Sequence, residues 1–210
     1  KESTVEVANL EHAIRDELNT TVPRAMAVLD PVKVVLSNYP EGKEEWIEAP
    51  NFPDDPPRMG SRKISFGREL FIEREDFMED PPKKFFRLSP GSEVRLRWGY
   101  FIRCEQVVKD ADGRVTELIC SYDPETKGGN APDGRKVRGT IHWVNAAHAV
   151  DAEVRLVDRL FMSEKPGGEN LLDDLNPDSL KVVKAKLEAS LGKAEAGQRF
   201  QFERQGYFCA

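Results

Sequence analysis

Near the C-terminal end of the chain, polar side chains that can recognise a nucleotide base alternate with aromatic side chains. Gln201 and Glu203 alternate with Phe200 and Phe202, so a strand here places the two rings on one face and the two polar groups on the other. Arg204 follows directly. Glutamine, glutamate and arginine offer directional, bidentate hydrogen bonds to nucleotide bases. A half-buried strand with solvated polar tips shows the same pattern, so these residue types alone leave both interpretations open.

A second group of candidate residues is basic. Residues 83–103 carry six basic side chains and one acid, Glu93, which gives this segment a net charge of +5. The basic residues are Lys83, Lys84, Arg87, Arg95, Arg97 and Arg103. If residues 93–103 form one strand, Arg95, Arg97 and Arg103 share a face, on which arginines two residues apart are separated by about 6.5–7 Å, close to the spacing of successive phosphates. Such arginines can neutralise an RNA backbone and stack on exposed bases. A solvated strand face is the alternative.

The composition as a whole does not indicate a nucleic-acid-binding protein. The chain has 210 residues, a formal net charge of −6, 39% hydrophobic residues and 32% charged residues. These values are typical of a globular chain with one large or two small domains. A local basic strip on an acidic body can still bind RNA selectively, because the rest of the surface repels non-specific contacts. No apolar run approaches the ~20 residues of a membrane-spanning helix, so we expect no membrane partner.

The sequence offers no pattern for catalysis or for metal binding. Three widely spaced cysteines, Cys104, Cys120 and Cys209, favour reduced thiols and a cytoplasmic location over a disulfide framework. Together with the three histidines they form no metal-ligand spacing, so we expect no metal site. We find no Ser-His-Asp arrangement and no phosphate-binding glycine loop, and we expect Glu73 and Glu75 to be solvated. The chain is therefore expected to carry no catalytic residue and no cofactor.

The elements that must position these residues are mostly strands. Leu10, Ile14 and Leu18 recur at four-residue spacing behind a capping box at residues 3–6, which predicts one helix over residues 4–18. The remaining pattern predicts strands at residues 32–38, 44–48, 63–66, 69–73, 93–108, 114–122, 137–144, 153–161, 180–187 and 199–208. Many short strands with turns rich in glycine and proline indicate an all-β sandwich or barrel.

Several long motifs, in a fixed order, carry a resemblance to a known family. They are PRAMAVLDPVKVV (residues 23–35), RLSPGSEVRLRWGYFI (87–102), DGRKVRGTIHWV (133–144), EVRLVDRLF (153–161) and FQFERQGYF (200–208). Through these motifs nearly the whole chain resembles the C-terminal anticodon-binding region of bacterial-type glutaminyl-tRNA synthetases. Lys1 is not a start methionine and Ala210 directly follows an apolar run, so we expect the chain to be a piece of a longer protein.

The resemblance implies a mainly β fold in which one α-helix precedes two six-stranded antiparallel β-barrels of the ribosomal protein L25-like anticodon-binding type. Residues 1–22 would form a helix that connects to the catalytic and helical body of the longer protein. Residues 23–53 and 145–210 would form the barrel near that body, built from both ends of the chain. Residues 54–144 would form the distal barrel.

The resemblance also implies that the polar residues read an anticodon. Arg24, Gln201 and Arg204 would meet around the middle base, a uridine in glutamine tRNAs, and Glu203 would orient the arginines. Strict alternation places Arg204 on the aromatic face, away from Gln201. We therefore expect a strand end or a bulge at Arg204.

The remaining implied contacts concern the other two bases and the stem. Arg95 and Arg97 would serve the first base, and Arg87 would read the third. Phe86 stands where the family often has a basic residue, and we expect it to be buried, with stacking on RNA as the alternative. Further tRNA contacts would come from the other basic residues and from the end of the helix, namely Lys83, Lys84, Arg103 and Asn19. Asn19 has an equally good interpretation as a helix C-terminal residue.

The function implied by the resemblance is recognition of the anticodon loop and stem of glutamine tRNA. A catalytic domain of the same polypeptide would use ATP, with magnesium, to ligate glutamine to that tRNA. Two alternatives share the barrel fold: the anticodon-binding region of an archaeal or eukaryotic-type glutamyl-tRNA synthetase, and a non-enzymatic L25-like RNA-binding protein. Gln201 and the closeness of the long motifs favour glutamine, and L25-like proteins usually have one barrel.

Overall fold

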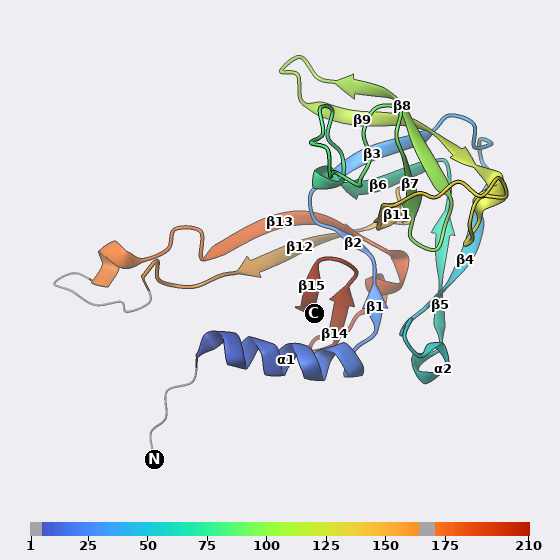
Figure 1. Cartoon of the computed structure of the whole chain (residues 1–210). Coiled ribbons are helices and arrows are strands. Elements are labelled where there is room, and N and C mark those ends of the chain that lie inside the picture. The colour runs from blue at the N-terminus through green and yellow to red at the C-terminus, as the bar shows by residue number, and fades with distance from the viewer. Residues whose placement is uncertain (1–5, 164–170) are drawn as a thin grey trace.

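The computed structural model describes residues 6–163 and 171–210, and it is mainly β with one long helix, as predicted (Figure 1). Helix α1 (Val7–Thr21) begins and ends three residues later than predicted. It stops before Val22, which is extended because a residue that precedes a proline avoids the helical conformation. Residues 3–5 of the expected capping box lie outside the described residues. No helix in the described part of the chain is long and apolar enough to cross a membrane.

The larger unit of the fold, which we call the first unit, is a seven-stranded sheet that curls into a nearly closed barrel. Its strands, in spatial order, are β10 (Thr140–Ile141), β7 (Glu93–Leu96), β8 (Phe101–Lys109), β9 (Val115–Asp123), β3 (Pro31–Leu36), β6 (Glu69–Glu73) and β11 (Trp143–Asn145). The two edge strands, β10 and β11, are consecutive in sequence and are separated only by His142. This short segment therefore brings the two edges of the sheet together.

Residues 140–145, where the two edges of the sheet meet, form a seam whose residues are held by close packing. Ile141 and Trp143 are fully buried in the core of the first unit, as their apolar types suggested, and the Trp143 Nε1–H donates to the Arg97 carbonyl at 2.9 Å. Just before the seam, a Cβ atom added to Gly139 would lie 1.9 Å from the carbonyl oxygen of Phe86. Glycine is needed at this position because the two backbones are in direct contact.

A two-stranded ribbon completes the first unit. It consists of β4 (Glu45–Pro50) and β5 (Ser61–Phe66), which are antiparallel and are joined across a short helix, α2 (Pro56–Met59). Phe66 packs edge-to-face against Tyr39 and Trp143 in the core, with ring centroids 5.3 and 5.2 Å apart. The ribbon thus extends from the core of the first unit towards helix α1 (Figure 1).

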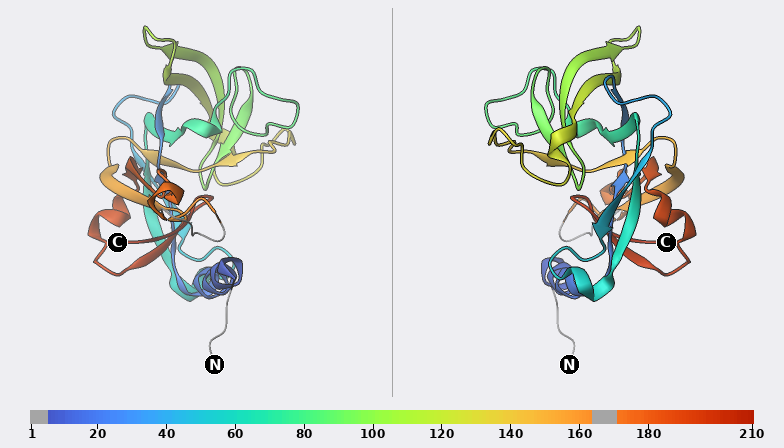
Figure 2. Two further views of the ribbon diagram at one scale, coloured as in Figure 1. Left: turned by 90° about the vertical axis from the view of Figure 1, so that its left-hand side faces the viewer. Right: turned by 90° about the vertical axis from the view of Figure 1, so that its right-hand side faces the viewer.

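The second unit is built from both ends of the chain. It contains two three-stranded sheets, one of β1 (Arg24–Ala25), β14 (Arg199–Phe202) and β15 (Gly206–Cys209), the other of β12 (Val150–Val157), β13 (Leu180–Leu187) and β2 (Ala27–Val28). Its core is small and includes Ala25, Ala27, Val154, Ala185, Leu187, Leu191 and Phe202. Helix α1 lies beside this unit, at the end of the molecule away from the seven-stranded sheet (Figure 2).

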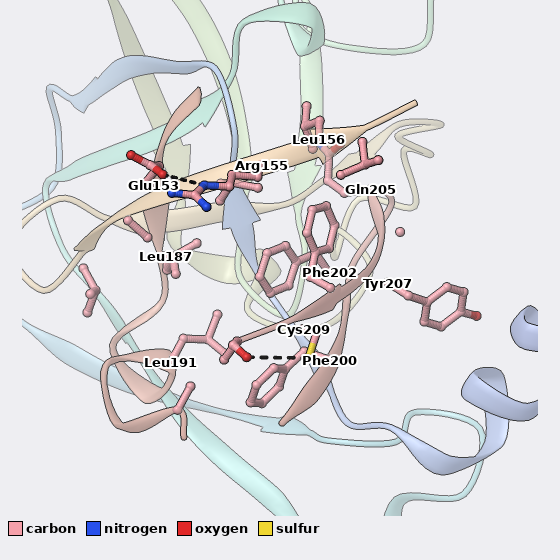
Figure 3. A pocket seen from close by; sticks show the side chains of 18 of the residues that line it. Glu153, Arg155, Leu156, Leu187, Leu191, Phe200, Phe202, Gln205, Tyr207 and Cys209 are labelled. Atoms are coloured by element: carbon pink, nitrogen blue, oxygen red, sulfur yellow. Dashed lines mark hydrogen bonds and ion pairs between the residues drawn. The ribbon is translucent and has the colours of Figure 1, made fainter. Parts of the chain in front are cut away.

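The second unit is not a closed barrel. Within residues 6–163 and 171–210, strands β12 and β15 each have a neighbour on one side only. Between them lies a groove of about 960 Å³, whose lining includes Leu191, Phe200 and Phe208 (Figure 3). In the described residues, one nearly closed sheet of seven strands, two sheets of three and one of two stand where two six-stranded barrels were expected.

The division of the chain between the units also differs from the expected one. Strand β3 was placed in the near barrel, with residues 23–53, but it pairs with β6 and β9 in the seven-stranded sheet. Its alternate residues Val32, Val34 and Leu36 are buried in the core of the first unit, which explains this pairing. The first unit thus runs from residue 31 to residue 145.

Two segments that were each predicted as one strand are hairpins. The chain reverses between β7 and β8, where Trp98 has a φ of 66°, and between β14 and β15, where Arg204 has a φ of 68°. At Trp98 apolar and polar residues continue to alternate, so the pattern gives no sign of the reversal, whereas three consecutive polar residues interrupt the alternation at residues 203–205. The left-handed backbone conformation of these two residues is uncommon for residues other than glycine, asparagine and aspartate.

We expect Gly139→Ala to lower the free energy of unfolding by about 1–3 kcal/mol, because the added methyl group must displace the Phe86 backbone. Urea unfolding followed by tryptophan fluorescence measures this change. Gly129→Ala is the matched control, since its added Cβ would meet no atom closer than 3.7 Å. Equal stability of the two variants would contradict the close contact at the seam.

Candidate nucleic-acid interface

The turn that joins β14 to β15 carries three consecutive polar residues, Glu203, Arg204 and Gln205, and each of them contacts the first unit. Strand β14 ends at Phe202, whose carbonyl accepts the Gln205 backbone N–H at 3.0 Å. The strand end expected at Arg204 is therefore present. Because the strand stops there, the side chains of the turn do not alternate between two faces of a sheet, and they project across the boundary between the two units.

Glu203 is the first of these contacts. Its carboxylate is almost fully buried, and it accepts hydrogen bonds from Arg97 Nε at 2.6 Å and from Trp98 Nε1 at 3.2 Å. Arg62 Nη2 lies 3.8 Å away. Glu203 thus orients Arg97, whereas Arg24 and Arg204, the arginines that it was expected to orient, pair with Asp54 and Asp76. The turn at Trp98, which the sequence did not reveal, is what directs the indole N–H to this carboxylate.

Arg204 makes a bidentate ion pair between the units. Its two terminal nitrogens donate to the two carboxylate oxygens of Asp76, each at 2.6 Å, and Nη1 lies 3.2 Å from His142 Nδ1. Asp76 is completely buried and also lies 3.3 Å from Arg87 Nε. The hydrogen bonds to Asp76 raise the pKa of Arg204 despite its partial burial. Within the described residues the guanidinium bonds to Asp76 and His142 rather than to Gln201.

Gln205 and His142 meet at Glu73, which is buried rather than solvated as we expected. Glu73 accepts hydrogen bonds from Gln205 Nε2 at 2.9 Å and from the Asp30 backbone N–H at 3.0 Å. Since Arg204 donates to His142 Nδ1, the ring proton of His142 lies on Nε2, 3.4 Å from Glu73. Burial alone would raise the pKa of Glu73, but the hydrogen bonds from His142 and the backbone outweigh it and lower that pKa.

Arg24 and Gln201, from opposite ends of the chain, are neighbours across the parallel pair β1–β14. Arg24 donates to Asp54 at 3.0 Å, and its guanidinium lies 4.3 Å from the centre of the Phe52 ring. Gln201 Oε1 is a buried oxygen with no hydrogen-bond partner in the described structure. A buried polar atom normally has a hydrogen-bond partner, so this oxygen is one of the exceptions in the described structure.

The register adds two residues to this pair. Tyr207 on β15 is the partner of Gln201, so the side chains of Arg24, Gln201 and Tyr207 form a row across three strands. The Tyr207 hydroxyl also forms a hydrogen bond with the Asn19 side chain at the end of α1. The sequence pattern predicted a role for Asn19 but not for Tyr207, because the hairpin that brings Tyr207 next to Gln201 was not recognised.

The basic residues of β7 and β8 do not form the single row that one strand would give. Arg103 lies on the neighbouring strand, opposite Glu93, because the chain reverses after Arg97. Arg95 and Arg103 nevertheless lie on the same face of the sheet, because Arg95 is the register partner of Phe101, two residues before Arg103. The Arg95 guanidinium lies 4.4 Å from the centre of the Phe101 ring. Partial burial lowers the pKa of Arg95.

The segment before β7 places Arg87 beside two carboxylates. Arg87 lies 3.3 Å from both Glu75 Oε1 and Asp76 Oδ1. Phe86 is 48% exposed, so the expectation that it is buried was wrong. Its ring is instead covered on one side by Arg138, whose guanidinium carbon lies 5.2 Å from the ring centre. Lys83 and Lys84 are exposed.

The cations of the interface fall into two groups by their partners. Four arginines are paired with carboxylates: Arg24 with Asp54, Arg87 with Glu75 and Asp76, Arg97 with Glu203, and Arg204 with Asp76. Four others carry no ion pair in the described part of the chain, namely Lys83, Lys84, Arg95 and Arg103. Paired guanidinium groups have a fixed orientation, which suits recognition of a base edge, whereas unpaired cations add positive charge, which suits phosphates.

The Glu73 carboxylate makes the free energy of unfolding depend on pH. Because its pKa is lower in the folded chain than its ordinary value of 4.5, it stabilises the fold above that pH, and this contribution is lost as the pH falls through the folded value. We expect Glu73→Gln to flatten the pH dependence of the free energy of unfolding between about pH 3 and pH 6. Urea unfolding across this range measures it. Glu75→Gln, which removes an exposed carboxylate from the same turn, should leave the slope nearly unchanged; identical slopes for both variants would contradict this role.

Comparison with known proteins assigns a family to this arrangement. Two family models, both described as the anticodon-binding domain of class I tRNA synthetases (E and Q), match residues 22–123 and residues 140–210. The glutamine–tRNA ligase of Nitrobacter hamburgensis is 59% identical over 207 residues, which cover 99% of this chain and 37% of that protein. That of Bradyrhizobium diazoefficiens is 57% identical over 207 residues, covering 98% of this chain and 37% of that protein.

A more distant relative extends the similarity. The glutamine–tRNA ligase of Pectobacterium atrosepticum is 53% identical over 211 residues, which cover 100% of this chain and 38% of that protein. The chain spans little more than a third of the length of these curated relatives. With the two models together matching most of its residues, the chain belongs to the anticodon-binding domain family of the class I tRNA synthetases (E and Q).

Proposed function

We propose that this chain recognises the anticodon loop and stem of glutamine tRNA, as part of a longer glutamine–tRNA ligase. The proposal is supported by the description of the family and by the names of the relatives. In this proposal a catalytic domain of the same polypeptide uses ATP, with magnesium, to ligate glutamine to the tRNA in the cytoplasm. The residues of the interface take no part in that reaction and act only through binding.

The observation that carries the proposal is the pair formed by Arg24 and Gln201, with Gln201 Oε1 buried and unpartnered. Uridine offers two carbonyl acceptors and one N–H donor. The Gln201 oxygen can accept that N–H, while the amide nitrogen and Arg24 can donate to the carbonyls. Asp54 and Phe52 hold Arg24 in place, so the site needs little reorganisation to receive the middle base of the anticodon.

Arg204 takes a supporting position in the same site. Asp76 and His142 occupy its two terminal nitrogens, which leaves the Nε–H without a partner in the described structure. Arginine has more N–H donors than these contacts use. Arg204 can therefore keep the turn fixed through Asp76 and still donate to a uridine carbonyl through Nε.

The first and third bases are assigned to the arginines of the first unit. Arg97, which Glu203 orients, and Arg95, which has no carboxylate partner, serve the first base and the adjoining phosphate. Arg87, oriented by Asp76 and Glu75, reads the third base. Lys83, Lys84, Arg103 and Asn19 contact the backbone of the loop and stem. Single-stranded bases must be unstacked to be read, and the residues proposed for the three positions lie on separate segments of the chain.

We expect Gln201→Glu to reduce the preference for a middle uridine over a cytidine. The carboxylate loses the amide donor to uridine, at a cost of about 1–3 kcal/mol, whereas the amino group of cytidine can donate to it. The measurement is titration of two glutamine-tRNA anticodon stem-loops, with uridine or cytidine in the middle, using the longest polypeptide that the gene encodes. Gln198→Glu adds the same charge at an exposed position and is the matched control.

Three results would overturn parts of the proposal. Equal binding of both stem-loops by the wild-type protein would leave only an RNA-positioning surface. Tighter binding of a glutamate-tRNA stem-loop would favour the glutamyl alternative. Absence of binding to any stem-loop would refute anticodon recognition.

Arg95→Ala and Arg97→Ala are expected to differ in their dependence on salt. Because Arg95 has no carboxylate partner, its loss should weaken all stem-loops alike and reduce the slope of log K against log salt by about 1. The charge of Arg97 is already balanced by Glu203, so its loss should change specificity at the first base more than the slope. Titrations at several salt concentrations check both. Equal slopes for the two variants would contradict the division between paired and unpaired arginines.

A further inference from the structure

The aromatic ring of Phe86 is an unusual surface feature, because 48% of this large apolar residue is exposed while a cation lies against it. Arg138 is itself exposed, and it has no hydrogen bond or ion pair in the described part of the chain. Its guanidinium carbon lies 5.2 Å from the centre of the Phe86 ring, which is a cation–π contact. Arg138 is therefore an unpaired, planar cation whose outer face and N–H groups are open to a ligand.

The backbone fixes this pair. The Phe86 carbonyl lies against Gly139, where even a Cβ atom would come within 1.9 Å. The Gly139 carbonyl in turn accepts the Arg95 backbone N–H at 2.9 Å, and the next residue, Thr140, is the register partner of Arg95. The pair is thus held between Arg87, which follows Phe86 in sequence, and Arg95, which lies on the adjoining strand.

The charges around the pair indicate the class of ligand. Lys83, Lys84 and Lys136 are exposed and have no ion pair in the described ranges, 6–163 and 171–210. An apolar protein partner would leave these cations and Arg138 without compensation. A nucleotide of single-stranded RNA satisfies both features, because its base stacks on an aromatic ring or a guanidinium plane and its phosphate neutralises the cations.

We propose that Phe86 and Arg138 form a stacking site for the third anticodon base, with Arg138 also contacting an adjoining phosphate. This inference rests on the proposed function and adds to it. Arg87, fixed by Asp76 and Glu75, contacts the edge of the base, while Phe86 and Arg138 hold its face. Specificity and affinity at this position thus come from different residues.

The test uses a glutamine-tRNA anticodon stem-loop that carries 2-aminopurine, whose fluorescence falls on stacking, in place of the third anticodon base. Affinities are measured on the unmodified stem-loop, with the longest polypeptide that the gene encodes. We expect Phe86→Leu and Arg138→Ala each to weaken binding roughly tenfold and to lose most of the fluorescence change. Arg138→Lys keeps the charge and the salt slope but also loses fluorescence quenching.

Lys136→Ala is the matched control, since it removes an exposed cation from the same segment without touching a ring. It should lower the salt dependence and keep the quenching. Thermal unfolding of every variant separates a loss of the fold from a loss of stacking. If wild-type protein discriminates uridine from cytidine at the middle position, but Phe86→Leu and Arg138→Ala keep the full fluorescence change, the stacking site is refuted and the proposed function stands. If wild-type protein binds no stem-loop, both fail.

Discussion

The arrangement of the two units depends on bidentate ion pairs between them, Arg204 with Asp76 and Arg62 with Glu188. Asp76 belongs to the first unit and is completely buried, so its charge must be compensated locally, and the main partner comes from the last hairpin of the chain. The same turn also directs Glu203 to Arg97 and Gln205 to Glu73. A turn of three residues thus fixes the sheet that carries Gln201 relative to the strand that carries Arg97.

Carboxylates explain how an acidic chain can present a basic recognition surface. The chain has a net charge of −6, yet several of its acids are paired with the arginines of the interface; Asp76 and Glu203 are buried, whereas Asp54 is exposed beside a largely buried Arg24. Asp54, Asp76 and Glu203 each hold a guanidinium group in one orientation. The unpaired cations then supply the attraction for RNA, and the paired ones supply direction. Removing an acid from this surface would therefore weaken recognition even though it makes the chain less negative.

The sequence predicted the local elements well and their partners poorly. Strands at residues 69–73 and 180–187 were predicted to the residue, because alternation of buried and exposed positions is a local property. The hairpin at Trp98 was missed because alternation continues through the turn, and the strand end or bulge expected at Arg204 did not reveal that the chain reverses there and pairs β14 with β15. The burial of Glu73 and Asp76 could not be foreseen either, since their partners Gln205 and Arg204 are more than a hundred residues away. The family resemblance named Arg24 and Gln201, but only the register shows that they are neighbours.

The topology of the second unit has a consequence for the order in which the protein assembles. The first unit is continuous from residue 31 to residue 145, so it can close while the ribosome is still adding the remainder of the chain. Strand β1 leaves the ribosome early but must wait for β14, its parallel partner, which is made almost last. Until then its unpaired edge is exposed to other chains. The surface that joins Arg24 to Gln201 is consequently the final part to form, and a chain interrupted before residue 199 lacks both β14 and Arg204, the main partner of buried Asp76.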